Sequence, residues 1–285
     1  MPTISVIIPY FEAGEFIAEA LDSLAKQSTP PDEIVCINDG STDGGPRIVE
    51  DFIKAHPMLK FIHIHQNNRG LGAARNAGLK VCTGEYIAWL DADDVFTHAK
   101  IDLVKSCLAG RPNTQWLTHP ALDWKDGDLR KRFFDIPKNT RQLLTKGNPF
   151  LPSATVLQTA LARMYPLMEN PLGAGTEDLD LWIRLFRDGI HPVKLSVPLT
   201  HYRIHNNAMS QQLEKHLERT IFCLEKNDIQ GPLFHTAIQR KYYENARVLQ
   251  RRGDHASAAK FYRMAGLRSF KTIAAYILNT FKIKV

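Results

Sequence analysis

The length, composition and charge of the chain exclude several classes of protein. Its 285 residues are 44% hydrophobic and 23% charged, which indicates an ordinary globular protein rather than a disordered or fibrous one. The formal net charge of +6 is concentrated near the C-terminus, because residues 211–285 carry 14 Lys and Arg against 6 Asp and Glu, and the rest of the chain carries 22 against 24.

Targeting signals and cysteines bound the cellular setting. No apolar run approaches the roughly 18 residues of a membrane-spanning helix, and the stretch "MPTISVIIPYFEAGE" has neither the basic start nor the apolar length of a secretory signal. The four cysteines are scattered and form no CxxC pair, so we expect neither a zinc site nor a disulfide framework. These features predict a cytoplasmic protein.

The first hundred residues alternate between strands and helices. Apolar, β-branched runs predict four strands, and the segments between them carry apolar residues at helical spacing. We expect the third helix, within "GLGAARNAGLKVCTG", to end at Gly84. This order predicts an α/β fold with a mostly parallel sheet, helices on both faces and ligands beyond the carboxyl ends of the strands. The predicted strands cover residues 3–9, 33–39, 60–66 and 86–94.

Two parts are expected along the chain. Residues 1–210 form an α/β domain, regular over about 1–100 and less regular over about 101–210, where a helix begins at Thr176. Residues 211–285 form a basic helical extension, and "RRGDHASAAKFYRMAG" within it is typical of a helical hairpin.

Three aspartates, Asp91, Asp93 and Asp94, follow the apolar run from Ile87 to Leu90. Like charges this close repel one another, so they are either solvated or gathered around something positive. Two carboxylates at i and i+2 can reach one divalent cation and the sugar of a nucleotide beside it. Mg²⁺ or Mn²⁺ takes one or two protein carboxylates and completes its shell with water and diphosphate oxygens. Because the cluster ends an apolar strand at the expected ligand edge, we favour the metal over a solvated loop.

The stretch "NDGSTDGG" ends the second predicted strand. A carboxylate at Asp39 could accept the N3–H of a uracil ring, but Asn, Asp, Gly and Ser are also ordinary turn formers. The residues alone leave these two interpretations open.

The stretch "NRGLGAARNAG" contains Gly70 and Gly72 in the spacing of a dinucleotide fingerprint. We reject NAD here, because Arg75 takes the place of the third glycine and the motif follows the third strand rather than the first. An arginine at this place can reach an anion or a base edge instead.

Two further stretches carry groups suited to catalysis. Glu177 and Asp178 open the helix in "GTEDLDLW", where the helix dipole alone favours acidic residues. The functional alternative is that Asp178 acts as a general base for an acceptor hydroxyl. In "HYRIHNNAMS", Arg203 suits a diphosphate and His205 could complete a metal shell, although a lone histidine is more often structural.

Together, six stretches in chain order closely resemble the family 2 glycosyltransferases of the GT-A fold, over roughly residues 3–210. One such motif would be weak evidence, whereas six in order are specific. The resemblance implies a GT-A fold whose first half binds a nucleotide-sugar and whose second half binds an acceptor. The six stretches are "VIIPYFEAGEFI", "NDGSTD", "NRGLGAARNAGL", "GEYIAWLDADD", "EDLDLWIRL" and "YRIHNNAMS".

The resemblance also implies an activity. Such an enzyme transfers a sugar with inversion from a nucleoside-diphosphate sugar, expected to be a UDP-sugar, to an acceptor hydroxyl, and it uses Mn²⁺ or Mg²⁺. The product would be a surface polysaccharide or glycolipid, and the acceptor a saccharide or a lipid-linked molecule. We expect "ALDWKDGDLRKRFF" and "NPFLPSAT" on the acceptor side. The sequence identifies neither the sugar nor the acceptor.

Roles for single residues follow from the same resemblance. It implies Asp178 as the catalytic base and Asp93 as a metal ligand. From the residues themselves we add Glu177 as the next candidate for the base and His205 as a second metal ligand. The residues implied for nucleotide binding are Pro9, Phe11, Glu12, Asp39, Asn68, Arg75, Asp91, Ala92 and Arg203.

Three positions depart from the family pattern. Phe11 stands where Tyr is usual, Glu12 where Asn is usual, and Asn38 where the first of two aspartates is usual. Glu12 is longer than the usual Asn and is acidic, so the contacts to the nucleobase are expected to differ from the family pattern.

Three other functions are weighed against this one. A nucleotidylyltransferase would share the sheet and the metal but carry a Gly-rich, basic loop after the first strand, where this chain has "PYFEAGE". A non-catalytic sugar-nucleotide binding module would keep Asp39 and lose Asp93 or Asp178, and both are present. A hydrolase with paired carboxylates would not need the diphosphate elements.

The C-terminal tail carries an amphipathic pattern over residues 267–284. An apolar helical face flanked only by cations suits an anionic membrane surface, which would place the protein peripherally on the inner face of a membrane. Docking of this helix on the protein's own domain is the equal alternative. Basic charge without a recognition motif does not predict nucleic-acid binding. The apolar residues are Leu267, Phe270, Ile273, Ala274, Ile277, Leu278 and Phe281, and the cations are Arg268, Lys271, Lys282 and Lys284.

Overall fold

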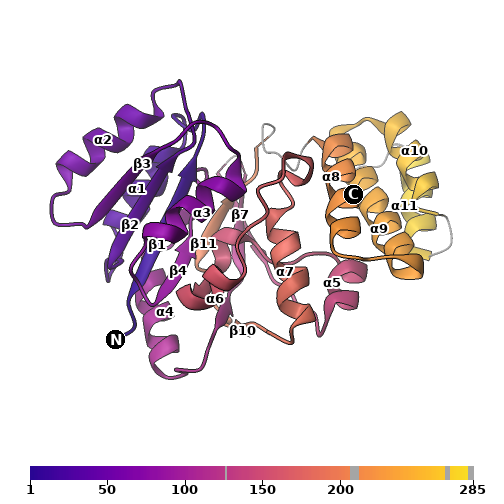
Figure 1. Ribbon diagram of the computed structural model, residues 1–285. Coiled ribbons are helices and arrows are strands. Elements are labelled where there is room, and N and C mark those ends of the chain that lie inside the picture. Colours follow the sequence, from indigo (N-terminus) through magenta and orange to yellow (C-terminus); the bar gives the residue numbers. More distant parts are fainter. Residues whose placement is uncertain (126, 206–211, 267–269, 282–285) are drawn as a thin grey trace. The chain divides into compact units, whose positions relative to one another are not determined.

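The computed structural model divides into two compact units (Figure 1). The residues that the structure describes are 1–125, 127–205, 212–266 and 270–281, of which 270 and 271 are described by their backbone alone. The first unit comprises Met1–Ile136 and Pro149–Ala208, and the second comprises Pro137–Asn148 and Met209–Val285. The second unit therefore includes a short segment from the middle of the chain.

A seven-stranded sheet forms the centre of the first unit. Its strands are β1 (Ile4–Tyr10), β2 (Glu33–Asn38), β3 (Phe61–His65), β4 (Tyr86–Trp89), β6 (Trp116–Thr118), β9 (Thr155–Gln158) and β10 (Val193–Lys194), in the order β10-β6-β9-β4-β1-β2-β3. The four predicted strands pair in parallel with one another. Strand β9 runs antiparallel between β4 and β6, so the sheet is mostly parallel, and the predicted fold class is confirmed.

Helices cover both faces of this sheet. They are α1 (Ile17–Ala25), α2 (Gly45–Ala55), α3 (Leu71–Val81), α4 (Lys100–Ala109), α6 (Thr159–Met164) and α7 (Glu177–Arg187), with single 3₁₀ turns at Pro152–Ala154 and Pro171–Gly173. Alternate side chains of β1 from Ile4 onward share a hydrophobic cluster with α1 and α4. Gly78 of α3 lies against Ile7 and Ile37, which point to the opposite face. Helix α7 starts directly after Thr176, where the sequence predicts it.

The prediction that α3 extends to Gly84 is wrong. The helix ends at Val81, because Cys82 has extended backbone angles (φ −62°, ψ 145°). Gly84 serves strand packing instead, since a Cβ at this position would lie 2.7 Å from the backbone nitrogen of Ser5. The glycine therefore permits the close approach of β4 to β1.

A smaller sheet lies beside the ends of the main strands. It consists of β5 (Val95–Phe96), β7 (Ala121–Lys125), β8 (Asp128–Arg132) and β11 (Thr200–Arg203), in the order β5-β11-β7-β8. Strand β11 pairs antiparallel with β5, which directly follows the three aspartates, and parallel with β7. This pairing brings β11, which lies near the end of the first unit's sequence, beside the aspartate cluster.

The second unit is helical. Its helices are α5 (Thr140–Lys146), α8 (Leu213–Lys226), α9 (Gly231–Arg252), α10 (His255–Met264) and α11 (Phe270–Thr280). Helices α9 and α10 form the expected hairpin, which turns at Gly253 with a left-handed φ of +83°. The hydroxyl of the buried Tyr262 donates to Gln250 across this hairpin at 2.5 Å. None of the described helices is long and apolar enough to cross a membrane.

Candidate functional site

Asp39, at the carboxyl end of β2, holds the loop that leads into α3. Its Oδ1 accepts hydrogen bonds from Gln66 Nε2 at 2.7 Å and from the backbone N–H of Arg69 at 2.9 Å, and its Oδ2 accepts from the N–H of Gly70 at 2.8 Å. A carboxylate has about four acceptor positions, so one direction at Oδ2 remains for a further donor. The side chain is thus both a loop anchor and a possible base contact.

The loop beside Asp39 packs closely against the loop that carries Asn68. Gly40 has a left-handed φ of +81°, and a Cβ there would lie 2.8 Å from the backbone nitrogen of Asn68. A side chain at position 40 would push the two loops apart. Asn68 itself is exposed at this edge of the sheet.

Glu12 is bound to the protein rather than left free. Its backbone is left-handed (φ 49°), and its Oε1 accepts from the N–H and the hydroxyl of Thr42 at 2.7 and 3.0 Å. Its own N–H donates to Ser41 Oγ at 3.1 Å. The long acidic side chain therefore joins the loop after β1 to the loop after β2, which gives a structural reason for this departure from the family pattern. Neighbouring Phe11 is half-exposed, and Pro9 is buried in β1.

The amide at Asn38 also has a local reason. Its Oδ1 accepts from the N–H of Ser41 at 2.8 Å, and its Nδ2 lies 3.2 Å from His65 Nδ1. Asn can donate to the ring nitrogen, which an ionised carboxylate cannot do.

Arg75 is the buried centre of an acidic cluster. It is 2% exposed, its Nη2 donates to Asp91 Oδ1 at 2.5 Å, and its guanidinium carbon lies 5.8 Å from the centre of the Trp89 ring. Burial alone would lower the pKa of Arg75, but Asp91, Glu177 and Asp178 together raise it. The arginine thus links the end of β4 to the start of α7.

Asp178 lies in this cluster with an altered proton affinity. Burial and the neighbouring carboxylate of Glu177 raise its pKa to about 6, against the opposing effect of Arg75. A carboxyl group with such a pKa is mostly ionised at pH 7 and is a stronger base than an ordinary aspartate. This arrangement suits a general base.

Glu177 is buried where α7 approaches α3. A Cβ at Gly72 would lie 2.1 Å from the backbone oxygen of Met168 and 3.1 Å from Glu177 Cγ. Gly72 therefore makes room for the segment before α7, which explains its place in a motif that is no dinucleotide fingerprint.

Asp93 and His205 lie together at the end of β4. Asp93 Oδ2 is 2.9 Å from His205 Nε2, and the histidine ring packs on Phe16 with 5.0 Å between ring centres. Burial and the nearby Asp91 raise the pKa of Asp93, and His205 acts in the opposite direction. A positive charge at this point would relieve the repulsion between the two aspartates.

Arg203 of β11 ties this region together. Its Nε donates to the backbone oxygen of Asp93 at 2.8 Å, and its Nη2 contacts Glu19 Oε2 at 2.5 Å. The guanidinium carbon lies 4.0 Å from the centre of the Trp124 ring and 5.1 Å from that of Phe16. Arg203 is therefore fixed between aromatic rings, with part of its planar donor set left for an anion.

A buried polar layer that the motifs do not reveal supports the aspartates. The backbone oxygen of Ser153 accepts from Lys100 Nζ at 2.6 Å and from the Thr200 hydroxyl at 2.7 Å, while its Oγ accepts from the N–H of Asp91 at 3.0 Å. Asp94 accepts the backbone N–H of Arg203 at 2.9 Å. Burial raises the pKa of Asp94 well above its usual value and lowers that of Lys100 well below.

Ala92 makes no polar contact through its side chain. It is buried and belongs to the hydrophobic cluster of the main sheet. Any contribution to nucleotide binding would come from its backbone.

A metal at this site would have few protein ligands. Within the described ranges, no group of three or more His, Cys, Asp or Glu side chains is arranged to hold a metal ion. Asp93 and His205 form a pair of oxygen and nitrogen donors, which fits an ion such as Mn²⁺ that takes its other ligands from diphosphate and water.

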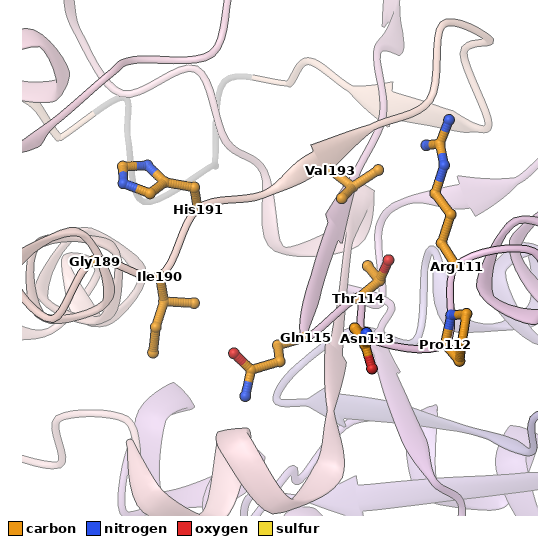
Figure 2. A pocket seen from close by; sticks show the side chains of 9 residues that line it. All are labelled: Arg111, Pro112, Asn113, Thr114, Gln115, Gly189, Ile190, His191 and Val193. Atoms are coloured by element: carbon orange, nitrogen blue, oxygen red, sulfur yellow. The ribbon is translucent and has the colours of Figure 1, made fainter.

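A pocket of about 390 Å³ lies elsewhere in the first unit (Figure 2). It is at the amino ends of β6 and β10, whereas the residues discussed above are at the carboxyl ends of β1, β2 and β4. It contains none of the predicted site residues. The lining residues are Arg111, Pro112, Asn113, Thr114, Gln115, Gly189, Ile190, His191 and Val193.

Comparison with known proteins agrees with the six motifs. A family model described as "Glycosyl transferase family 2" matches residues 5–146. TuaG of Bacillus subtilis (strain 168), a glycosyltransferase provisionally assigned to teichuronic acid biosynthesis, is 27% identical over 225 residues, which are 78% of this chain and 86% of TuaG. EpsH of the same strain, provisionally described as a glycosyltransferase, is 29% identical over 76% of this chain and 65% of EpsH. The chain thus spans just under two thirds of EpsH.

Solved structures show the same fold. The structure of TarS 1–349 of S. aureus, in complex with UDP-GlcNAc, matches this chain with a TM-score of 0.65 at 18% identity. The match covers 98% of this chain and 88% of the TarS chain. The mannosyltransferase PcManGT from Pyrobaculum calidifontis, in complex with GDP-Man and Mn²⁺, matches with a TM-score of 0.62 at 19% identity. The match covers 98% of this chain and 79% of the PcManGT chain. At these identities the likeness concerns the fold alone.

Proposed function

The chain belongs to glycosyl transferase family 2 and is a glycosyltransferase, and we propose that it transfers a sugar with inversion from a nucleoside-diphosphate sugar to an acceptor hydroxyl. The observation that carries this proposal is the cluster around Arg75. It joins Asp91, at the end of β4, to Asp178, whose pKa is raised to about 6. A carboxylate with a raised pKa, held beside the end of β4, can accept the proton of a hydroxyl bound there.

We propose a UDP-sugar as the donor. The remaining acceptor direction of Asp39 Oδ2 would take the N3–H of uracil, with Pro9, Phe11 and Asn68 around the base. The solved TarS complex contains UDP-GlcNAc, which supports this donor class. The N1–H of guanine would offer the same donor atom, and the PcManGT complex contains GDP-Man, so GDP-sugars belong in the same experiment.

The donor's ribose and diphosphate would lie along the end of β4. In this proposal Asp91 contacts the ribose, the backbone of Ala92 lies beside it, and the remaining guanidinium donors of Arg203 approach the diphosphate. Glu12 would act through the loop it holds. Arg75 would act chiefly by fixing Asp91 and the start of α7.

Asp93 and His205 would hold Mn²⁺ or Mg²⁺. Asp93 Oδ2 and His205 Nε2 lie 2.9 Å apart, so both atoms would reach one ion, and diphosphate oxygens and water would complete its shell. When bound, the ion stabilises the negative charge that develops on the departing nucleoside diphosphate. The solved complex of PcManGT contains Mn²⁺ together with GDP-Man, which supports this assignment.

Asp178 would remove the acceptor's proton. The acceptor oxygen attacks the anomeric carbon from the face opposite the diphosphate, the carbon–oxygen bond to the diphosphate breaks, and the hydroxyl proton moves to Asp178. Holding both substrates together supplies much of the remaining acceleration. Glu177 is the next candidate for the base, but it is buried against α3.

The acceptor would be a saccharide or a lipid-linked molecule in the synthesis of a surface polysaccharide or glycolipid. The provisional assignment of TuaG to teichuronic acid biosynthesis supports a polysaccharide. Attachment to an anionic membrane surface through residues 267–284 is part of the same proposal, because a lipid-linked acceptor lies at such a surface.

An acceptor-dependent release of nucleoside diphosphate tests the proposal. Purified protein is screened with UDP- and GDP-sugars by thermal shift in the presence of Mn²⁺, because a ligand of the folded state raises its melting temperature. The donor found is then incubated with candidate acceptors. Release of UDP or GDP only when acceptor is added supports glycosyl transfer. Release of pyrophosphate would indicate a nucleotidylyltransferase, release without an acceptor a hydrolase, and binding without turnover a binding module.

A further inference from the structure

Helix α11 packs against the second unit through its small and polar side chains. Thr272, Ala275 and Asn279 lie on one face of the helix and are buried. Asn279 Nδ2 donates to the backbone oxygen of His255 at 2.9 Å, and its Oδ1 lies 2.8 Å from His255 Nδ1. Tyr276 beside this face packs edge-on against Tyr262. These contacts fix the rotation of α11 about its own axis.

The opposite face of α11 is apolar and exposed. Ile273, Ile277 and Phe281 recur every four residues and are 39%, 48% and 72% exposed; we call these three residues the α11 stripe. The sequence pattern left open whether such a stripe docks on the protein's own domain. The structure shows that α11 does dock, but through its other face, so these three apolar side chains remain in water. Exposed apolar groups gathered in this way mark an interaction surface.

Part of the predicted amphipathic pattern is not covered by this observation. Leu267, Arg268, Lys282 and Lys284 lie outside the described residues, and the side chains of Phe270 and Lys271 are not described. Ala274 and Leu278 flank the stripe and are half-buried.

The charged side chains near the α11 stripe in the sequence are all positive. After Asp254 there are six Lys and Arg and no Asp or Glu. Of these cations, Lys260 and Arg263 lie exposed on α10, the helix against which α11 packs. A two-fold contact between copies of the stripe would bring together two chain ends that carry cations and no acidic residue. A nucleic acid would leave the stripe in water. An anionic bilayer matches both features, because it offers hydrocarbon beneath negative headgroups.

We propose that the α11 stripe docks on the surface of an anionic lipid bilayer, with Ile273, Ile277 and Phe281 in the acyl boundary and Lys260 and Arg263 among the headgroups. The inference deepens the proposed function by naming the surface that meets a lipid-linked acceptor, and it rests on that function for this link only. Vesicle binding needs no turnover, so its failure and the failure of the proposed glycosyl transfer are distinguished.

Flotation of the full chain with lipid vesicles tests the proposal. Vesicles of phosphatidylcholine, with and without phosphatidylglycerol, are compared at low and at high salt. We expect the protein to float with the phosphatidylglycerol vesicles, and to float less at high salt because the charges are screened. Replacing the stripe (Ile273→Ser, Ile277→Ser and Phe281→Ser together) should lower the apparent affinity for vesicles ~10-fold or more, because apolar burial is lost.

Two sets of control variants separate the stripe from general effects. A matched set of exposed apolar residues in the first unit (Met58→Ser, Leu103→Ser and Val197→Ser) should leave vesicle binding unchanged. Lys260→Gln with Arg263→Gln should weaken binding to the anionic vesicles only. If the triple stripe variant loses its helical circular dichroism, the single variant Phe281→Ser takes its place, since that residue is the most exposed of the three.

The proposal is overturned if the full chain stays unbound under all of these conditions, or if the stripe and matched variants bind equally well. It is also overturned if wild type is dimeric by light scattering and the stripe variant monomeric, while neither binds vesicles. In that case the occupant of the stripe is a second copy of the chain.

Discussion

The strand-end site and helix α11 both bury polar side chains, but only α11 also leaves a row of large apolar side chains exposed. At the strand ends, Arg75 and Lys100 are buried and held by Asp91, Ser153 and Thr200. In α11, small and polar side chains are buried while the α11 stripe faces water. Both arrangements run against the usual distribution of residues. Each region therefore shows a distribution of side chains that function, rather than folding stability, explains best.

The two regions also differ in how rigidly they hold their key groups. Three segments distant in sequence, at Asp91, Ser153 and Arg203, are joined by partly buried hydrogen bonds at the strand ends. The α11 stripe has no comparable network among the described residues, and its helix is held only through contacts of the other face, such as those of Asn279. The proposed catalysis needs groups in a fixed geometry, whereas docking on a membrane tolerates variation. This difference fits the difference in rigidity between the two regions.

Removal of the metal ligand Asp93 should have the largest effect. We expect Asp93→Ala to abolish Mn²⁺- or Mg²⁺-dependent transfer, because the ion would lose its only carboxylate among the proposed ligands. The fold should stay intact, since the pKa of Asp93 is raised by burial and its charge does not stabilise the native state. Transfer assays with and without EDTA measure the effect. The exposed Asp51→Ala on α2 is a matched control, and full activity of Asp93→Ala would refute the assignment.

Neutralising the base Asp178 should have the next largest effect. Asp178→Asn keeps the shape of the side chain but cannot accept a proton, so we expect transfer to fall ~10²-fold or more, the usual weight of general-base catalysis. Donor affinity by calorimetry should stay near that of the wild type. Asp188→Asn, at the other end of α7, is the control. If Asp178→Asn retained its transfer rate, Asp178 would be a helix-dipole residue and Glu177 would be tested next.

The same substitution should stabilise the protein. A carboxyl whose pKa is raised in the folded state costs stability once it ionises, so the cost grows as the pH rises from about 4 to about 6 and is constant above. Asp178→Asn should therefore raise the free energy of unfolding at pH 7 by about 1–2 kcal/mol, allowing for partial solvent screening. At pH 4 the two proteins should be equally stable. Urea denaturation at both pH values measures this, and a loss of stability at pH 7 would contradict the raised pKa.

A polar contact in α11 should matter for stability alone. Asn279→Ala removes two partly buried hydrogen bonds to His255, which should cost about 1–2 kcal/mol. Thermal unfolding of the full chain measures the loss, and Thr280→Ala on the exposed side is the control. Donor affinity should not change, since Asn279 lies in the other unit. An unchanged melting temperature would mean that the rotation of α11 is not fixed by this pair.

The sequence predicted those parts of the molecule that depend on local pattern. Apolar runs predict the four parallel strands, and the acidic cluster after Leu90 is expected at the carboxyl end of the fourth strand, where Asp91 and Asp93 lie. The end of α3 was mispredicted, because Gly84 was interpreted as a helix cap when it is required by the approach of Ser5. Such a contact between strands leaves no local mark in the sequence.

The supporting residues could not be found in this way. Ser153 and Thr200 lie in segments without a motif, and Lys100 is an ordinary residue of a helix until burial makes it unusual. In α11, helical spacing identified the apolar stripe but not the face that packs. Asn279 decides that face through a single pair with His255, and only the tertiary structure reveals such a pair.

The pH dependence of kcat/KM tests the central claim, that Asp178 at the strand-end cluster is the base of a glycosyl transfer, most directly. The base must be ionised, so the rate should rise through about pH 6 and level off above it, following the raised pKa of Asp178. His205→Gln, with saturating Mn²⁺, serves as the control for a titrating histidine. This variant should keep the rise through about pH 6, which is the acidic limb of the profile. Asp178→Asn should lack it. A limb that vanishes in His205→Gln and persists in Asp178→Asn would contradict the account.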